Sequence, residues 1–394
     1  MHHTQNHLAV FARTNFRTEH RPFGIRTTDR LFHIYMLGKT GTGKSTLLET
    51  LMRDDLRAGY GFALVDPHGD LVERVLGAVP DERKGDVIYF DVPDRSRTLS
   101  FNPLGGVPFE KRSLAASAML EVFRKLWADS WGPRLEHILR NALLALLDQE
   151  KPVLADVLRL LSDDDYRRGV GQRVENPQVR SFWLREFPGY PDRFRAEAIA
   201  PIQNKVGAFL ANPLLYGILN GKGEGLDLRR VMDEGKILLV NLAKGKIGED
   251  TANLLGSLLV SSIGNAAFGR AEIPETERRH FWVYLDEFQN FTTLSLANML
   301  SELRKYRVGL VLAHQYLSQL APEIRDAIIG NVGTIISFRI GLADAEIVAR
   351  EFYPEISEGD LVYLPNHEIY LKLMTLGIQT HPFSAETLAP RDIA

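Results

Sequence analysis

Short apolar runs recur along the chain, and several of them are followed by helical patterns. Continuous apolar strands that alternate with helices are typical of a parallel sheet covered on both faces. Between two of the runs, apolar residues from Leu296 to Tyr306 recur at helical spacing. The pattern therefore predicts an α/β fold with a mainly parallel sheet. The apolar runs lie at residues 31–37, 61–66, 86–91, 236–242, 280–286, 308–314 and 333–340.

From about Glu110 to Asn220 the strand pattern disappears and helical stripes replace it, the clearest of them between Leu135 and Leu147. Such a stretch inside an α/β sequence indicates an inserted all-α domain. We therefore predict three parts. These are an N-terminal extension at residues 1–30, an α/β domain made of 31–109 and 221–394, and an all-α insertion at 110–220.

The composition is that of an ordinary globular protein, with 394 residues of which 45% are hydrophobic and 25% charged. The formal net charge is −3, so a contact with nucleic acid would have to be a local patch. Cysteine is absent, which excludes disulfides and thiol catalysis and fits a reducing compartment. The N-terminal sequence does not read as a signal peptide, and we expect a cytoplasmic protein.

The longest uncharged stretch, residues 251–269, has the length of a membrane span. It carries polar residues throughout, among them Asn253, Ser257 and Asn265. Because polar side chains are costly in a bilayer, we expect a buried helix of a soluble domain and no membrane segment of the chain's own.

The stretch GKTGTGKS follows one apolar run and precedes the helical segment STLLETLM. It matches G-x-x-x-x-G-K-[ST], in which glycines let backbone N–H groups approach phosphate oxygens at a helix N-terminus. We expect Lys44 to reach the β- and γ-phosphates and Ser45 to ligate Mg²⁺; the alternative is a glycine-rich turn. The predicted phosphate-binding residues are Gly38, Thr40, Gly41, Thr42, Gly43, Lys44, Ser45 and Thr46.

Two carboxylates follow another apolar run, in the string FWVYLDEF. A phosphate loop that supports hydrolysis needs a carboxylate for the metal and a group that orients the attacking water. We predict that Asp286 holds the Mg²⁺ shell and that Glu287 polarises the water. The alternative is a solvated acidic turn, but open α/β sheets bind ligands at this end of their strands.

Other polar residues also follow apolar runs. Gln315 comes after the run 308–314 and is predicted to hydrogen-bond the γ-phosphate or the water, with a strand-end cap as the alternative. Asp66 and His68 lie at the end of the run 61–66, and we interpret them mainly as residues of a helix entry. The alternative is a position close to the γ-phosphate.

Six strings in a fixed order resemble the HerA/FtsK superfamily of DNA-pumping ATPases, and most of all the motor part of TraG/TraD-like type IV secretion coupling proteins. The likeness covers nearly everything after about residue 30 and includes the helical insertion. The strings are GKTGTGKST (38–46), LVDPHGDL (64–71), SFNPL (100–104), WGPRLEHILRNALLAL (131–146), LDEFQNF (285–291) and LAHQYLSQL (312–320).

The resemblance implies a RecA-like P-loop NTPase that forms a homohexameric ring, binds ATP and Mg²⁺ between subunits, and threads double-stranded DNA through a central channel. Loops after the run 236–242 face the channel in the family, so Lys244 and Lys246 are predicted to contact DNA phosphates. The alternative is an ordinary solvated loop. Coupling proteins usually begin with transmembrane helices and HerA proteins with a β-barrel, and this sequence has about 30 residues before its first predicted strand.

A further cation usually stabilises the transition state of phosphoryl transfer. In ring motors that resemble this chain, it is an arginine of the neighbouring subunit. Arg304 and Arg307 are the first candidates for this catalytic role and Arg339 is the next.

The function predicted from the sequence is an ATP-driven DNA translocase for conjugation-like transfer, DNA processing or defence. A nuclease, a relaxase or a secretion channel would be its partner. Two alternatives stay open: a nucleotide-gated ring scaffold that recruits a nuclease or other effector, and a secretion motor acting on protein. Stimulation of ATP turnover by DNA would distinguish the first from the others.

Overall fold

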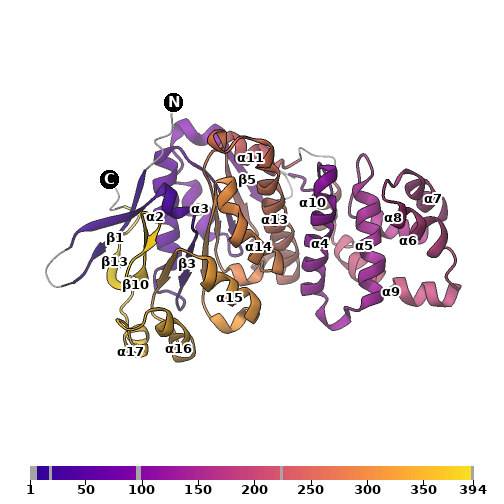
Figure 1. Ribbon diagram of the computed structural model, residues 1–394. Coiled ribbons are helices and arrows are strands. Elements are labelled where there is room, and N and C mark those ends of the chain that lie inside the picture. The colour runs from indigo at the N-terminus through magenta and orange to yellow at the C-terminus, as the bar shows by residue number, and fades with distance from the viewer. Residues whose placement is uncertain (1–6, 17–19, 95–98, 222–224, 392–394) are drawn as a thin grey trace. The chain divides into compact units, whose positions relative to one another are not determined.

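A computed structural model describes residues 7–16, 20–94, 99–221 and 225–391 (Figure 1). The chain forms two compact units. The first contains residues 1–91, 229–246 and 270–394, and the second contains 92–228 and 247–269. The second unit extends beyond the predicted insertion at both ends. It also includes the whole of α13 (Glu249–Gly269), because this apolar helix packs against α4 (Arg112–Leu126).

The first unit is built on a sheet of 11 strands, of which seven neighbouring strands are parallel. Each of the predicted apolar runs contains one of these parallel strands, so the predicted fold class is confirmed. Across the sheet the order is β9 (Thr334–Ser337), β3 (Ile34–Leu37), β8 (Val308–His314), β7 (Phe281–Leu285), β4 (Gly61–Asp66), β6 (Ile237–Asn241) and β5 (Val87–Asp91).

Beyond β9 the sheet continues with four antiparallel strands that the apolar pattern did not indicate. In these strands buried positions are mixed with positions that are partly or fully exposed. Two of them come from the predicted N-terminal extension, which therefore adds to the sheet. In order from β9 they are β10 (Glu368–Lys372), β13 (Phe383–Thr387), β1 (Leu8–Thr14) and β2 (Pro22–Arg26).

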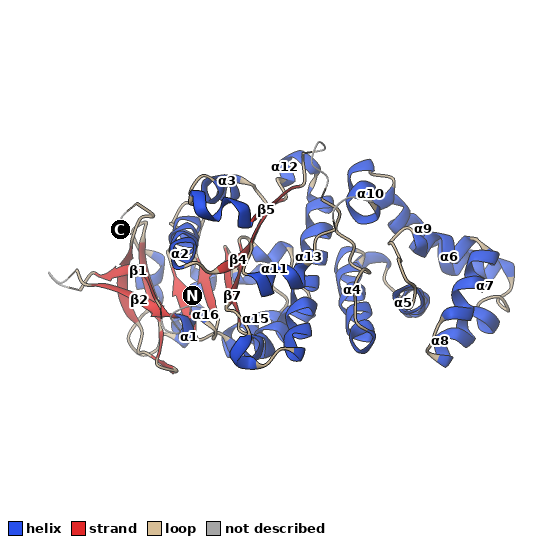
Figure 2. Ribbon diagram, turned by 90° about the horizontal axis from the view of Figure 1, so that it is seen from above, coloured by secondary structure: helices blue, strands red, loops and turns tan. Residues whose placement is uncertain are grey.

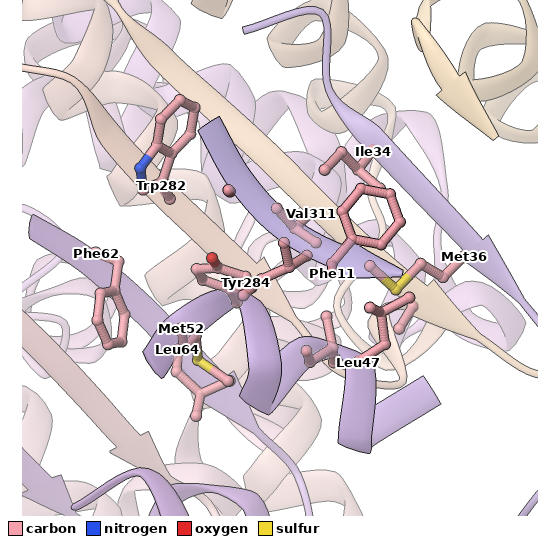
Figure 3. Packing of buried hydrophobic residues seen from close by; sticks show 14 of the residues in the cluster. Phe11, Ile34, Met36, Leu47, Met52, Phe62, Leu64, Trp282, Tyr284 and Val311 are labelled. Atoms are coloured by element: carbon pink, nitrogen blue, oxygen red, sulfur yellow. The ribbon is translucent and has the colours of Figure 1, made fainter. Parts of the chain in front are cut away.

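Helices α2 (Lys44–Ala58) and α3 (Asp70–Leu76) cover one face of the parallel strands, and α15 (Pro322–Asn331) lies on the other side (Figure 2). Leu47 and Met52 of α2 pack into an apolar cluster with Trp282 and Tyr284 of β7 (Figure 3). Glycine at position 59 ends α2 in the left-handed conformation, with φ 76°. The packing of α2 on the sheet holds its first turn next to the carboxyl ends of the strands.

The remaining elements of the first unit are short or lie at its edges. They are α1 (Thr27–Arg30), α11 (Leu228–Glu234), α12 (Lys244–Ile247), α14 (Leu294–Glu302), α16 (Leu342–Glu351), α17 (Glu358–Val362) and the hairpin of β11 (Met374–Thr375) with β12 (Ile378–Gln379).

The second unit is helical in the residues that the structure describes. The predicted stripe from Leu135 to Leu147 is the buried side of α5 (Pro133–Leu147). The uncharged stretch predicted as a buried helix lies in α13, most of whose residues are buried. No helix among the described residues has the length and hydropathy needed to cross a membrane. The other helices of the second unit are α6 (Asp156–Ser162), α7 (Asp164–Arg173), α8 (Pro177–Ser181), α9 (Asp192–Leu210) and α10 (Pro213–Asn220).

Candidate nucleotide-binding site

The glycine-rich loop connects β3 to the first turn of α2, as the sequence pattern predicted. Gly41 and Gly43 have φ of 76° and 124°, values that side-chain-bearing residues rarely adopt. The buried Thr42 closes the loop, because its hydroxyl donates to the Lys39 carbonyl over 2.7 Å. The loop therefore combines a tight backbone turn with the N-terminus of a 15-residue helix.

Lys44 is the first residue of α2 and is buried. Its Nζ donates to the carbonyl oxygens of Gly38, at 2.5 Å, and Lys39, at 3.2 Å. Burial lowers the pKa of Lys44, whereas the charges of Glu287 and Asp286 act in the opposite direction. The ammonium group is thus held over the loop, where phosphate oxygens are expected.

Ser45 and Asp286 meet at the carboxyl edge of the sheet. Ser45 Oγ donates to Asp286 Oδ2 over 3.2 Å. Burial raises the pKa of Asp286 to about 7, with further contributions from Asp66 and Glu287. A divalent cation between these oxygens would remove this penalty on the charged carboxylate.

Glu287 follows directly and has a left-handed backbone, with φ 46°. Two amide groups hold its carboxylate: Gln315 Nε2 donates to Oε1 over 2.5 Å and Gln289 Nε2 donates to Oε2 over 2.7 Å. Strained conformations of this kind concentrate at functional sites. Gln315 also accepts a hydrogen bond from the hydroxyl of Thr40, over 3.1 Å, and so connects Glu287 to the phosphate loop.

The side chains of Lys44, Ser45, Asp286, Glu287 and Gln315 line one pocket with a volume of about 260 Å³. The predicted residues of the loop, the metal site and the water-orienting group are thereby brought together. His68 and His367 line the same pocket, and sequence reasoning did not select His367 for it. The lining residues are Thr40, Gly41, Gly43, Lys44, Ser45, Thr46, His68, Asp286, Glu287, Gln315 and His367.

Asp66 serves the helix that follows it. Its carboxylate accepts backbone N–H bonds from His68, Leu71 and Val72, over 2.8, 2.9 and 3.2 Å. The N–H groups of Leu71 and Val72 belong to the first turn of α3 and lack partners within the helix. This geometry agrees with the interpretation of Asp66 as part of a helix entry.

The arginine candidates lie at two different edges of the sheet. Arg304 and Arg307 lie at the amino-terminal edge, where they line a pocket of about 250 Å³ with His280. Arg307 accepts a bond from Phe281 N with its carbonyl, and the Arg304 guanidinium lies 3.6 Å above the ring of Phe32. Within one subunit these two side chains are therefore separated from the phosphate loop by the length of the strands.

Arg339 lies at the carboxyl edge, two residues after the end of β9 rather than on the strand. Its carbonyl accepts a bond from Lys39 N of the phosphate loop over 2.9 Å. Its guanidinium donates to Leu364 O, over 3.1 Å, and to Asn366 Oδ1, over 2.9 Å. Arg339 therefore braces a loop of its own subunit.

Lys244 and Lys246 lie in α12, just after β6 and outside the phosphate pocket. Lys246 is exposed and Lys244 is half-buried. The backbone N–H of Lys244 donates to Pro67 O over 2.8 Å, which holds this short helix at the carboxyl edge of the sheet. Their contact with DNA stays a prediction.

The pocket fits a nucleotide with Mg²⁺. The loop supplies N–H donors and a lysine for phosphates, while Ser45 and Asp286 supply two hard oxygen ligands. Among the described residues no cluster of three His, Cys, Asp or Glu side chains could hold a metal alone. A cation here would therefore need phosphate oxygens and water to complete its coordination.

Comparison with known proteins places this site in a family context. Residues 280–352, which include Asp286, Glu287 and Gln315, match the family described as "TraM recognition site of TraD and TraG". The chain is TraG/TraD-like over this segment. The sequence resemblance to TraG/TraD-like proteins is thereby confirmed for this segment. No curated protein matches the chain significantly.

Solved structures agree over nearly the whole chain. The bacterial conjugative coupling protein TrwBdeltaN70 is 17% identical, with a TM-score of 0.66 over 94% of this chain and 86% of that one. The plasmid coupling protein TrwB in complex with ADP and Mg²⁺ has a TM-score of 0.66 at 17% identity, over 93% and 87%. VirB4 of Thermoanaerobacter pseudethanolicus has a TM-score of 0.62 at 15% identity, over 96% of both chains. At these identities the likeness establishes the fold.

Proposed function

We propose that this protein is an Mg²⁺-dependent ATPase that assembles as a homohexameric ring and moves double-stranded DNA. The observation that carries the proposal is the arrangement of Lys44, Ser45, Asp286 and Glu287 around one pocket. A phosphate loop alone would support nucleotide binding. A carboxylate held by two amides beside the metal ligands adds what hydrolysis requires.

Different residues of the pocket have different roles in binding and hydrolysis. Lys44 and the N–H groups of residues 38–46 hold the β- and γ-phosphates, and Ser45 and Asp286 hold the cation. Mg²⁺, when bound, neutralises charge that develops on the phosphate oxygens. Glu287 accepts a hydrogen bond from the attacking water and orients it, while Gln289 and Gln315 fix the carboxylate. Through Thr40, Gln315 is placed to sense whether the γ-phosphate is present.

Double-stranded DNA as the cargo is supported by the TraG/TraD match and by the TrwB-like fold. The chain's net charge of −3 requires a local contact, for which we propose Lys244 and Lys246 at the channel. The family description also suggests a relaxosome-type protein partner for the segment 280–352. A relaxase, a nuclease or a secretion channel is the partner that we propose for the ring. We also propose that the ring works in the cytoplasm.

The decisive experiment measures ATP turnover with and without linear duplex DNA, together with the particle mass in solution. We expect a hexamer whose turnover increases with DNA and requires Mg²⁺. Turnover that is indifferent to DNA in a stable ring would reject the translocase and favour the scaffold or the protein-secretion motor. Absence of any turnover in an ATP-binding ring would reject the assignment of Glu287.

A further inference from the structure

A loop from the carboxyl-terminal part of the chain reaches the phosphate loop. Residues 364–367 lie between α17 and β10 and are fixed at both ends. At one end the Arg339 guanidinium donates to Leu364 O and Asn366 Oδ1. At the other end Thr387 of β13 donates to the His367 carbonyl twice, from N over 2.9 Å and from Oγ1 over 3.1 Å.

His367 joins this loop directly to the nucleotide pocket. Its backbone N–H donates to Thr42 O over 2.9 Å, and its side chain lines the pocket. The imidazole lies against Gly43: a Cβ placed on Gly43 would be 2.9 Å from His367 Nδ1. Glycine at position 43 is therefore favoured by its backbone angle, and a Cβ there would displace the imidazole beside it.

The backbone of His367 is strained, with φ 68°. A non-glycine residue in this region costs of the order of 1–3 kcal/mol and persists where surrounding contacts impose it. Here three hydrogen bonds to its backbone, from Thr42 and Thr387, impose it. The fold thus holds an exposed imidazole at a fixed position over the phosphate loop.

We propose that His367 is a nucleotide-contacting residue whose imidazole N–H donates a hydrogen bond to a phosphate oxygen of the bound nucleotide. The inference rests on the proposed function, because it takes the pocket to be a nucleotide site. Gly43 belongs to the part of the loop that cradles phosphates, immediately before Lys44. An imidazole above it faces the phosphate chain, and imidazole N–H groups are suitable donors to anionic oxygen.

Binding of two probes tests the contact without turnover or DNA. ADP and inorganic pyrophosphate, each with Mg²⁺, are titrated into the full chain and into His367→Gly, which removes the ring and relaxes the left-handed backbone. We expect both probes to bind about tenfold more weakly, as for the loss of one charge-assisted hydrogen bond. His367→Gln keeps a Cβ and an N–H donor, so it should retain part of the affinity, and it replaces the glycine variant if that variant does not fold.

Thr387→Val is the matched control, because it removes one anchor of the loop but keeps the imidazole. It should weaken both probes less than His367→Gly does. An equal loss in the two variants would overturn the contact and leave His367 a structural residue. Weaker ADP with unchanged pyrophosphate would overturn the phosphate assignment, and unchanged binding of both would overturn the inference entirely.

These outcomes are separable from a failure of the proposed function. If the unaltered chain binds neither ADP nor ATP, and Lys44→Ala behaves in the same way, the nucleotide site itself is wrong. If the unaltered chain binds both and Lys44→Ala does not, the site holds, and only the His367 variants decide the inference.

Discussion

Ser45 Oγ and Asp286 Oδ2 lie 3.2 Å apart although the two residues are separated by 241 positions in the chain. Ser45 is on the first turn of α2 and Asp286 follows β7, so their proximity depends on the packing of that helix on the sheet. Ser45 belongs to the phosphate loop that binds the nucleotide, and Asp286 directly precedes Glu287, to which we assign a role in hydrolysis. Substitutions in the loop should therefore affect nucleotide binding, whereas substitution of Glu287 should affect turnover.

Lys44→Ala should abolish nucleotide binding, whereas Glu287→Gln should keep binding and lose turnover. The first removes the positive charge over the phosphates, and the second removes only the carboxylate that polarises water. Fluorescent-nucleotide titration and a phosphate-release assay on both variants give the comparison. Near-normal turnover in Glu287→Gln would refute the role given to that residue.

Mg²⁺ binding should weaken as the pH falls below about 7. Burial raises the pKa of Asp286 to about 7, with Asp66 and Glu287 as further causes, so protons compete with the cation in this range. Since the native state then binds a proton more tightly than the unfolded chain, this carboxyl also contributes stability at acidic pH that is lost as the pH rises from about 4 to about 7. The Mg²⁺-induced rise in melting temperature, measured at about pH 6 and about pH 8, should be smaller at the lower pH.

Asp286→Asn provides the control, because an amide does not titrate. This variant should show a small Mg²⁺ effect that is the same at both pH values. A pH dependence that survives in Asp286→Asn would assign the titration to another group.

A buried network connects α2 to β7 and to Arg30, the last residue of α1. The Arg30 guanidinium donates to both carboxylate oxygens of Asp55, over 2.6 and 3.0 Å, and to Tyr284 Oη over 2.6 Å. Tyr284→Phe should lower the free energy of unfolding by about 1–2 kcal/mol. Arg30→Met should lower it by about 3–5 kcal/mol, because it leaves Asp55 buried and unpaired.

Urea denaturation measures both effects. Tyr60→Phe is the matched control, since its hydroxyl contacts the Thr27 hydroxyl at 3.0 Å. Its effect should be smaller than that of Tyr284→Phe. Equal losses of unfolding free energy in the two tyrosine variants would indicate that the contact of Tyr284 with charged groups adds no further stability.

The sequence predicted the parallel strands and the phosphate loop because both follow from local patterns. A fully buried strand such as β8 is a continuous apolar run, and the loop has fixed spacing. The antiparallel strands were missed because half-buried strands like β10 have no such run. His367 was missed because its place depends on Thr42 and Thr387, residues far away in the sequence. Arg304 and Arg307 lie just before β8 and therefore at the amino-terminal edge of the sheet. The sequence alone did not show how far this edge is from the phosphate loop.

Replacing Lys244 and Lys246 with Ala should weaken DNA binding to a similar extent for different sequences and reduce its salt dependence. Phosphate contacts carry no sequence information. Each contact that is lost reduces the number of counterions that DNA releases on binding, and so reduces the salt dependence. Basal ATP turnover should remain, because α12 does not line the phosphate pocket. Affinity measured across a salt series provides the slope. A slope identical to that of the unaltered protein would make this loop ordinary surface.

The last prediction concerns the cation that the neighbouring subunit would supply. Arg304 and Arg307 lie at the edge of the sheet opposite the phosphate loop, so they could act only on the site of another copy. Arg339 lies beside its own loop with its guanidinium engaged by Leu364 and Asn366, so its removal should also disturb the local pocket. We therefore expect Arg304→Ala or Arg307→Ala to bind ATP almost normally and lose turnover, whereas Arg339→Ala should weaken binding as well.

Mixed rings test this assignment. A heterologous ring places one face of each subunit against a different face of the next, so a mixture contains interfaces with an intact site and an intact arginine. Adding Lys44→Ala to Arg304→Ala or Arg307→Ala should restore part of the turnover, because Lys44→Ala still offers its arginines. Exchange of subunits is verified first, by mass or by fluorescence transfer. If exchange occurs and none of the three arginine variants is rescued, none of these arginines acts on the site of the neighbouring subunit, and a cation of the same subunit becomes the next candidate.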